Sequence, residues 1–160
     1  MKQNEATYIV MVMTSRHPNA TMVKFGYPAS LVQEYDNWVV LVRPAQCTLG
    51  ALVLVNKSEI QSFSGLGGES FEELERVTQD IERNLTVFRA YQKINYLMLM
   101  MVDKEVHFHV LPRYESDQAF GGVVYPDSGW PMAPDLAAGL VLESEKMESL
   151  VGELKIIWAS

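Results

Sequence analysis

The chain has 160 residues, which is enough for one compact domain. Apolar residues make up 48% and charged residues 21%, which is typical of a globular protein with a hydrophobic core and excludes a disordered chain. The net charge of −7 excludes the broad basic field that gathers nucleic acid or anionic membrane, so we expect neither as a partner. Cys47, the single cysteine, excludes an internal disulfide framework and is typical of a reducing compartment, so we expect a cytoplasmic protein.

The N-terminal part of the chain holds one short apolar run, Tyr8–Met13. It is shorter than the apolar core of a signal peptide and far shorter than a membrane span. We interpret residues 1–21 as an N-terminal extension or a short strand.

Two aliphatic runs follow, and they predict neighbouring antiparallel strands over Trp38–Arg43 and Ala51–Asn56. After a glycine-rich connection, apolar residues recur at spacings of three and four from Phe71 to Phe88, which predicts an amphipathic helix. Ser70 with Glu73 three residues later has the pattern of a helix N-cap.

The segment Ile94–Val102 is almost entirely apolar and holds Met98, Met100 and Met101, and its length predicts a strand buried on both faces. Packing in the core or in a dimer interface is favoured over an adaptable binding surface, which methionines can also form. The next predicted strand, Glu105–Pro112, is separated from it by only Asp103 and Lys104, so we expect the two to pair through a tight turn. Glycines and prolines between residues 121 and 134 break any regular pattern before Ser144, which can cap a final helix reaching towards Trp158.

The strand at Glu105–Pro112 carries the candidate chemistry. Side chains alternate between the faces of a strand, so Glu105, His107 and His109 share one face while Val106, Phe108 and Val110 face the core. Alternate residues lie about 6.5 to 7 Å apart, close enough for both imidazoles to address one phosphate group. Three interpretations remain open: two ordinary histidines on a half-exposed strand, a zinc site on His107, His109 and Glu105, and a nucleophilic imidazole at His107.

The segment Val106–Tyr114, VHFHVLPRY, resembles the second half of the histidine-triad (HIT) motif, in which three histidines alternate with hydrophobic residues. The upstream segment Leu41–Leu66 resembles the strand pair and lysine-bearing turn that precede the helix in that family. The resemblance covers a core of residues 22–115, and residues 116–160 form a C-terminal loop and helix of the same domain.

The resemblance implies an α+β fold with a five-stranded antiparallel sheet, a main helix and a C-terminal helix, assembled as a homodimer. It implies hydrolysis or transfer of nucleotidyl groups, from nucleoside phosphoramidates or dinucleoside polyphosphates, through a nucleotidyl-histidine intermediate that needs no metal and no cofactor. His107 matches the nucleophile, and His109 matches the histidine that binds and polarises the phosphate.

The chain departs from the family pattern at several positions. Glu105 replaces the first histidine of the triad, and its anion should repel a phosphate unless it is protonated or turned to hold the His107 imidazolium. In the family, a glycine-rich loop before the motif donates hydrogen bonds to the phosphates. This loop is shortened here, and Lys104 is the candidate replacement donor. Arg43 stands where the family carries a ribose-binding Asp or Asn; an arginine cannot accept a hydrogen bond, so either Arg43 binds phosphate or the ligand is not a nucleoside.

Two further cations need an interpretation. Arg113 is either a phosphate contact or a solvated arginine, and Lys57 is expected to shape its turn. Because of these departures a second function stays open, namely a binding module that keeps the nucleotide or phosphate pocket without turnover.

Overall fold

The computed structural model describes residues 17–160, so the apolar run at Tyr8–Met13 lies outside the described residues. Its helices are α2 (Ala20–Lys24), α3 (Gly68–Phe88) and α4 (Ser144–Ala159), with short 3-10 turns at Phe63–Gly65 and Leu136–Ala138. Its strands are β1 (Leu31–Glu34), β2 (Trp38–Val42), β3 (Ala45–Gln46), β4 (Leu52–Asn56), β5 (Lys93–Leu97), β6 (His107–Arg113), β7 (Gln118–Phe120), β8 (Val123–Tyr125) and β9 (Leu140–Val141).

The centre of the fold is a five-stranded antiparallel sheet in the order β1-β2-β4-β6-β5. The predicted pair β2 and β4 is confirmed, with Trp38 opposite Asn56 and Val42 opposite Leu52. Both strands are buried along their whole length, which explains why their sequences are continuous apolar runs without alternation. The expected α+β fold is therefore confirmed.

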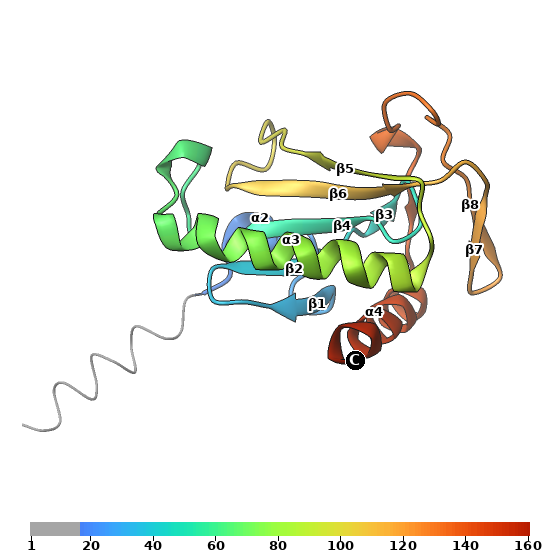
Figure 1. The fold of residues 1–160 in the computed structure, drawn as a ribbon, viewed down its shortest axis with the longest axis horizontal. Helices are drawn as coiled ribbons and strands as arrows, with labels where there is room; N and C mark the ends of the chain where they lie inside the picture. The colour runs from blue at the N-terminus through green and yellow to red at the C-terminus, as the bar shows by residue number, and fades with distance from the viewer. Residues whose placement is uncertain (1–16) are drawn as a thin grey trace, which may run out of the picture.

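The two faces of the sheet are covered differently. On one face, α3 and α4 contribute the buried side chains that pack against Val40, Leu54 and Val110, and Figure 1 shows α3 lying over the sheet, roughly along its strands. On the other face, Met22 and Phe25 from α2 and its end cover a smaller apolar layer made by Val39, Leu41, Val53 and Val55. The second face, with its thin cover, leaves room for a ligand site.

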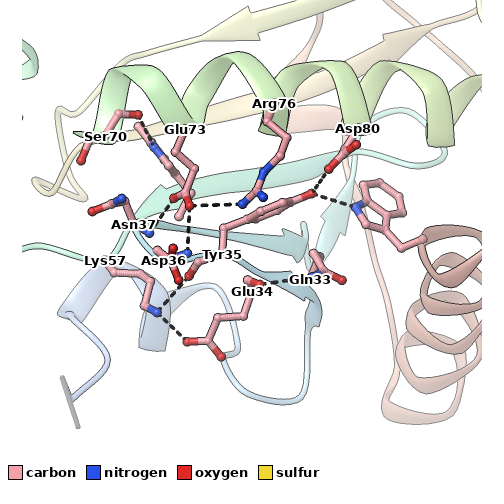
Figure 2. A network of polar contacts seen from close by, with 12 residues as sticks. Gln33, Glu34, Tyr35, Asp36, Asn37, Lys57, Ser70, Glu73, Arg76 and Asp80 are labelled. Atoms are coloured by element: carbon pink, nitrogen blue, oxygen red, sulfur yellow. Dashed lines mark hydrogen bonds and ion pairs between the residues drawn. The ribbon is translucent and has the colours of Figure 1, made fainter. Parts of the chain in front are cut away.

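The start of α3 corrects the predicted N-cap. The helix begins at Gly68 with Gly67 as its N-cap, so Ser70 lies inside the first turn, where its hydroxyl accepts a hydrogen bond from Asn56 Nδ2 at 3.1 Å. Figure 2 shows why Glu73 does not complete a capping box: its carboxylate reaches the turn between β1 and β2 and accepts hydrogen bonds from the backbone N–H groups of Asp36 and Asn37. A tertiary contact has replaced the local one.

Lys57 helps to hold the same turn. Its ammonium group donates to the backbone carbonyl of Tyr35 at 3.1 Å and pairs with Glu34 at 2.9 Å, as Figure 2 shows. Lys57 therefore holds the turn between β1 and β2, and not the turn after β4 in which it lies itself.

The predicted strand Ile94–Val102 is shorter and more exposed than expected. β5 ends at Leu97, and it is an edge strand that pairs only with β6, antiparallel as expected. Residues 98–106 form the connection to β6, so the predicted tight turn at Asp103 and Lys104 is wrong. Met100 has a φ of +49°, a left-handed conformation that turns the chain out of the strand, and Met101 and Val102 beyond it are 83% and 77% exposed.

The C-terminal part contains more regular structure than the sequence predicted. β7 and β8 form a hairpin across Gly121 and Gly122, whose positive φ values of +55° and +76° suit a tight two-residue turn. The final helix α4 is present, but its N-cap is Glu143, because Ser144 is already helical. Among the described residues, no helix combines the length and apolar character needed to cross a membrane.

Candidate functional site

His107 and His109 lie side by side on the thinly covered face of the sheet. His107 stands opposite Val55, and His109 stands opposite Val53 on β4 and Leu97 on β5. The centroids of the two imidazole rings are 5.2 Å apart. The shared face predicted from strand alternation is confirmed for both histidines, and Val106 and Val110 are buried in the core on the other face.

One ring nitrogen of His107 is fixed by the backbone. Nδ1 lies 2.7 Å from the carbonyl oxygen of Glu105, and a carbonyl oxygen can only accept a hydrogen bond. The neutral imidazole therefore carries its proton on Nδ1 and keeps its lone pair on Nε2. This arrangement leaves the Nε2 lone pair available to a ligand.

His109 is buried and weakly basic. Its side chain is 7% exposed, and its Nδ1 has no hydrogen-bond partner within residues 17–160. Burial, as the largest cause, and the nearby Arg43 and His107 together lower the pKa of His109 to about 4. At neutral pH His109 is an uncharged imidazole that can donate one N–H to a ligand.

Both histidines open into a cavity of about 400 Å³. It is also lined by Arg43, by Lys24 and Phe25, by Leu136 and by the connection 99–103. The Phe25 ring lies 5.9 Å from the His107 ring and 5.6 Å from the His109 ring, so it forms an apolar wall beside them. Two larger cavities, one beside α4 and one beside Arg113, contain neither histidine.

The Glu105 side chain points away from the two imidazoles. Its carboxylate accepts a hydrogen bond from the Thr21 hydroxyl at 2.5 Å and lines a separate cavity of about 150 Å³. The expectation that the carboxylate is turned to hold His107 is wrong, since only the Glu105 carbonyl contacts that ring. Lys104 lines the same separate cavity, so the structure does not bring it to the two histidines.

The two candidate arginines have different surroundings. Arg43 lines the histidine cavity. Arg113 is 4% exposed and is neither solvated nor in that cavity. It forms a bidentate ion pair with Asp127, at 2.7 and 3.0 Å, and donates to Asn95 and to the carbonyl of Met132. These contacts use its donors, so Arg113 holds the 127–132 segment against β5 and β6.

The zinc interpretation has no geometric support in the described part of the chain. Within residues 17–160, no group of three or more His, Cys, Asp or Glu side chains is placed to hold a metal ion. The bond between Glu105 and Thr21 explains this result, because it draws the third proposed ligand away from His107 and His109.

Sequence reasoning missed several lining residues. Phe25 and Lys24 come from α2 and its end, where the sequence shows no strong helical pattern. Residues 99–102 fall within the predicted strand Ile94–Val102, and that prediction hides their position at the mouth of the site. A buried strand and an exposed connection can have the same apolar composition. They differ in their exposure to solvent, which composition does not report.

No protein-family model and no curated protein sequence matches this chain. Solved structures do match. A histidine triad protein from Bradyrhizobium japonicum is 17% identical, with a TM-score of 0.63 over 89% of this chain and 97% of that one. A hypothetical histidine triad nucleotide-binding protein from Sulfolobus tokodaii is 16% identical, with a TM-score of 0.64 over 87% and 89%.

A third similar structure is the diadenosine triphosphate hydrolase of Plasmodium falciparum, which is 11% identical, with a TM-score of 0.61 over 81% of this chain and 76% of that one. At these identities the likeness establishes the architecture and leaves the activity to the site itself. This chain has the fold of the histidine triad superfamily.

Proposed function

We propose that this protein hydrolyses or transfers nucleotidyl groups, from a nucleoside phosphoramidate or a dinucleoside polyphosphate, through a covalent bond between phosphorus and His107. The observation that carries the proposal is the contact between His107 Nδ1 and the Glu105 carbonyl, which leaves the Nε2 lone pair for the cavity shared with His109. The likeness to histidine triad structures supports it.

The reaction has two steps. Nε2 of His107 attacks the phosphorus, the bond from phosphorus to the leaving nitrogen or oxygen breaks, and the leaving group takes a proton from water. Water then attacks the phosphorus of the nucleotidyl-histidine, the P–N bond breaks, and the nucleoside monophosphate leaves with His107 restored. The neutral His109 donates an N–H to a non-bridging oxygen and stabilises the charge that develops there.

A binding module without turnover is the second candidate. It is favoured by the position of the Glu105 carboxylate, which is bonded to Thr21 outside the histidine cavity and so cannot protonate a leaving group there. A phosphoramidate needs that proton more than a polyphosphate does, because an amine is the poorer leaving group. Turnover of the two substrates therefore separates the candidates.

We propose that the protein acts as a homodimer whose interface includes the segment Ile94–Val102 or the helix that contains Phe71. β5 has one unpaired edge in the described sheet, and apolar side chains of the following connection are exposed beside it. Such an edge invites pairing with another chain. Phe71 is 40% exposed at the start of α3.

The test measures hydrolysis of adenosine 5′-phosphoramidate and of diadenosine triphosphate by the wild type, His107→Ala and His109→Ala. Loss of the nucleophile should reduce kcat by about 1,000-fold or more, and loss of His109, which stabilises charge without forming a bond, should cost less. Circular dichroism confirms that each variant is folded. Turnover by His107→Ala within a few-fold of wild type would overturn the covalent mechanism, and nucleotide binding without any turnover would establish the binding module.

A further inference from the structure

Arg43 differs from the other arginines that the structure describes. Each of the others forms an ion pair with a carboxylate: Arg76 with Glu73, Arg83 with Asp80, Arg89 with Glu153 and Arg113 with Asp127. Within residues 17–160, no carboxylate lies within 4.0 Å of the Arg43 guanidinium, and its Nε is buried without a hydrogen-bond partner. The one cavity-lining carboxylate, Asp103, pairs with Lys24 at 3.5 Å.

The sheet register places Arg43 beyond His109 on the same face. Leu41, Val53 and His109 lie opposite one another on β2, β4 and β6. The backbone N–H of Arg43 donates to the carbonyl of Ala51, so Arg43 and Ala51 face each other two residues further along these strands. Ala51, between Arg43 and β6, has only a methyl group, which lets the long arginine side chain cross towards the histidines. His107, His109 and Arg43 thus line one cavity in that order along the face.

The donors of the guanidinium are only partly used. Nη1 donates to the carbonyl of Ala45, and this contact anchors the side chain at the end of β2. A guanidinium that is partly buried without an anion is costly, and a bidentate anion such as phosphate offsets that cost best. His109 beside it is neutral and has an unpartnered Nδ1, so it attracts an anion by donating a hydrogen bond rather than by charge.

We propose that Arg43 binds a second phosphate group of the ligand, one that His107 does not attack, so that the site prefers nucleotides with two phosphates over nucleoside monophosphates. The inference rests on the proposed function, because His107 and His109 are taken as the site of the first phosphate. The second phosphate is attached either to the ribose or to the first phosphate, and both attachments present the same oxygens to a guanidinium.

The experiment measures dissociation constants by isothermal titration calorimetry for 5′-monophosphates, 5′-diphosphates, 2′,5′-bisphosphates and 3′,5′-bisphosphates of adenosine and guanosine. We expect the wild type to bind at least one of the doubly phosphorylated ligands about tenfold or more tightly than the monophosphate. The preferred isomer identifies where the second phosphate is attached.

Three variants assign the preference to Arg43. Arg43→Gln should abolish the preference, because it weakens binding of the doubly phosphorylated ligands more than binding of the monophosphates, and Arg43→Lys should keep part of it. Arg83→Gln makes the same chemical change on the exposed side of α3 and should keep all of it. Circular dichroism and thermal unfolding confirm that the compared variants are folded.

Several results would overturn the proposal. One is wild-type binding of all ligands of each nucleoside within threefold, and another is a preference that survives in Arg43→Gln. Absence of binding by every nucleotide would overturn this inference and the proposed function together. A preference that depends on Arg43 in a protein that hydrolyses neither substrate would instead confirm the second phosphate site and refute only the proposed turnover.

Discussion

The buried His109 should make the stability of the protein depend on pH in a way that a single substitution removes. Its pKa is lowered to about 4 in the folded protein, chiefly by burial, whereas an unfolded histidine has a pKa of about 6.5. As the pH falls below about 6.5 the unfolded chain binds a proton at this residue and the folded chain does not. Stability that is present above pH 6.5 is therefore lost progressively as the pH falls to about 4.

The two pKa values give the size of the effect. The full difference corresponds to about 3 kcal/mol of unfolding free energy, and about 2 kcal/mol of it develops between pH 7 and pH 5. Urea unfolding of the wild type and of His109→Gln at both pH values measures it, because the two proteins differ only at this residue. We expect the variant to lose about 2 kcal/mol less than the wild type on going to pH 5.

A matched control separates this effect from the general consequence of losing a histidine. His17→Gln changes an exposed residue and should keep the wild-type pH dependence of stability. If wild type and His109→Gln lose the same unfolding free energy between pH 7 and pH 5, His109 is not held neutral by burial. The description of His109 as an uncharged donor would then have to be abandoned.

Three other predictions concern Arg113, Glu105 and the assembly. Arg113→Met should lower the unfolding free energy by about 3 to 5 kcal/mol in chemical denaturation, because it leaves the buried Asp127 carboxylate without its ion-pair partner; a loss below about 1 kcal/mol would contradict this. Glu105→His should raise kcat/KM for the phosphoramidate about tenfold or more, because an imidazole can supply the proton that a carboxylate bonded to Thr21 does not, and an unchanged or lower rate would refute the reasoning. Light scattering at micromolar concentration should give twice the chain mass of 18.1 kDa, and Met101→Asp should lower it if the exposed connection after β5 is in the interface; a wild-type monomer would exclude the homodimer.

Local patterns predicted the central strands and the position of the two histidines. β2 and β4 are continuous apolar runs because both of their faces are buried, and strand alternation alone places His107 and His109 together. These features depend on residues that are neighbours in the sequence or in one register. They could be predicted without knowledge of the rest of the fold.

The errors arise where distant residues decide the outcome. Glu73 binds the backbone at Asp36 and Asn37 instead of capping its own helix, and Arg113 pairs with Asp127, which a folded-back segment brings to β6. The carboxylate of Glu105 is drawn away by Thr21, a residue 84 positions earlier in the chain. No spacing in the sequence reports these contacts.

The exposed connection after β5 shows a different limit. Leu99 to Val102 is as apolar as a buried strand, yet the left-handed Met100 turns it outward at the mouth of the site. Apolar composition predicts burial in general, and it does not distinguish burial in a core from a surface that meets a ligand or a second chain.

The most direct test of the covalent mechanism is to look for the bond between phosphorus and His107. The wild-type protein is mixed with adenosine 5′-phosphoramidate, quenched within milliseconds to seconds at alkaline pH, and analysed by intact-protein and peptide mass spectrometry. The mechanism predicts a transient adenylyl group on the peptide that contains His107, and no adduct in His107→Ala. Turnover of the substrate without any adduct, or an adduct on another residue, would contradict it.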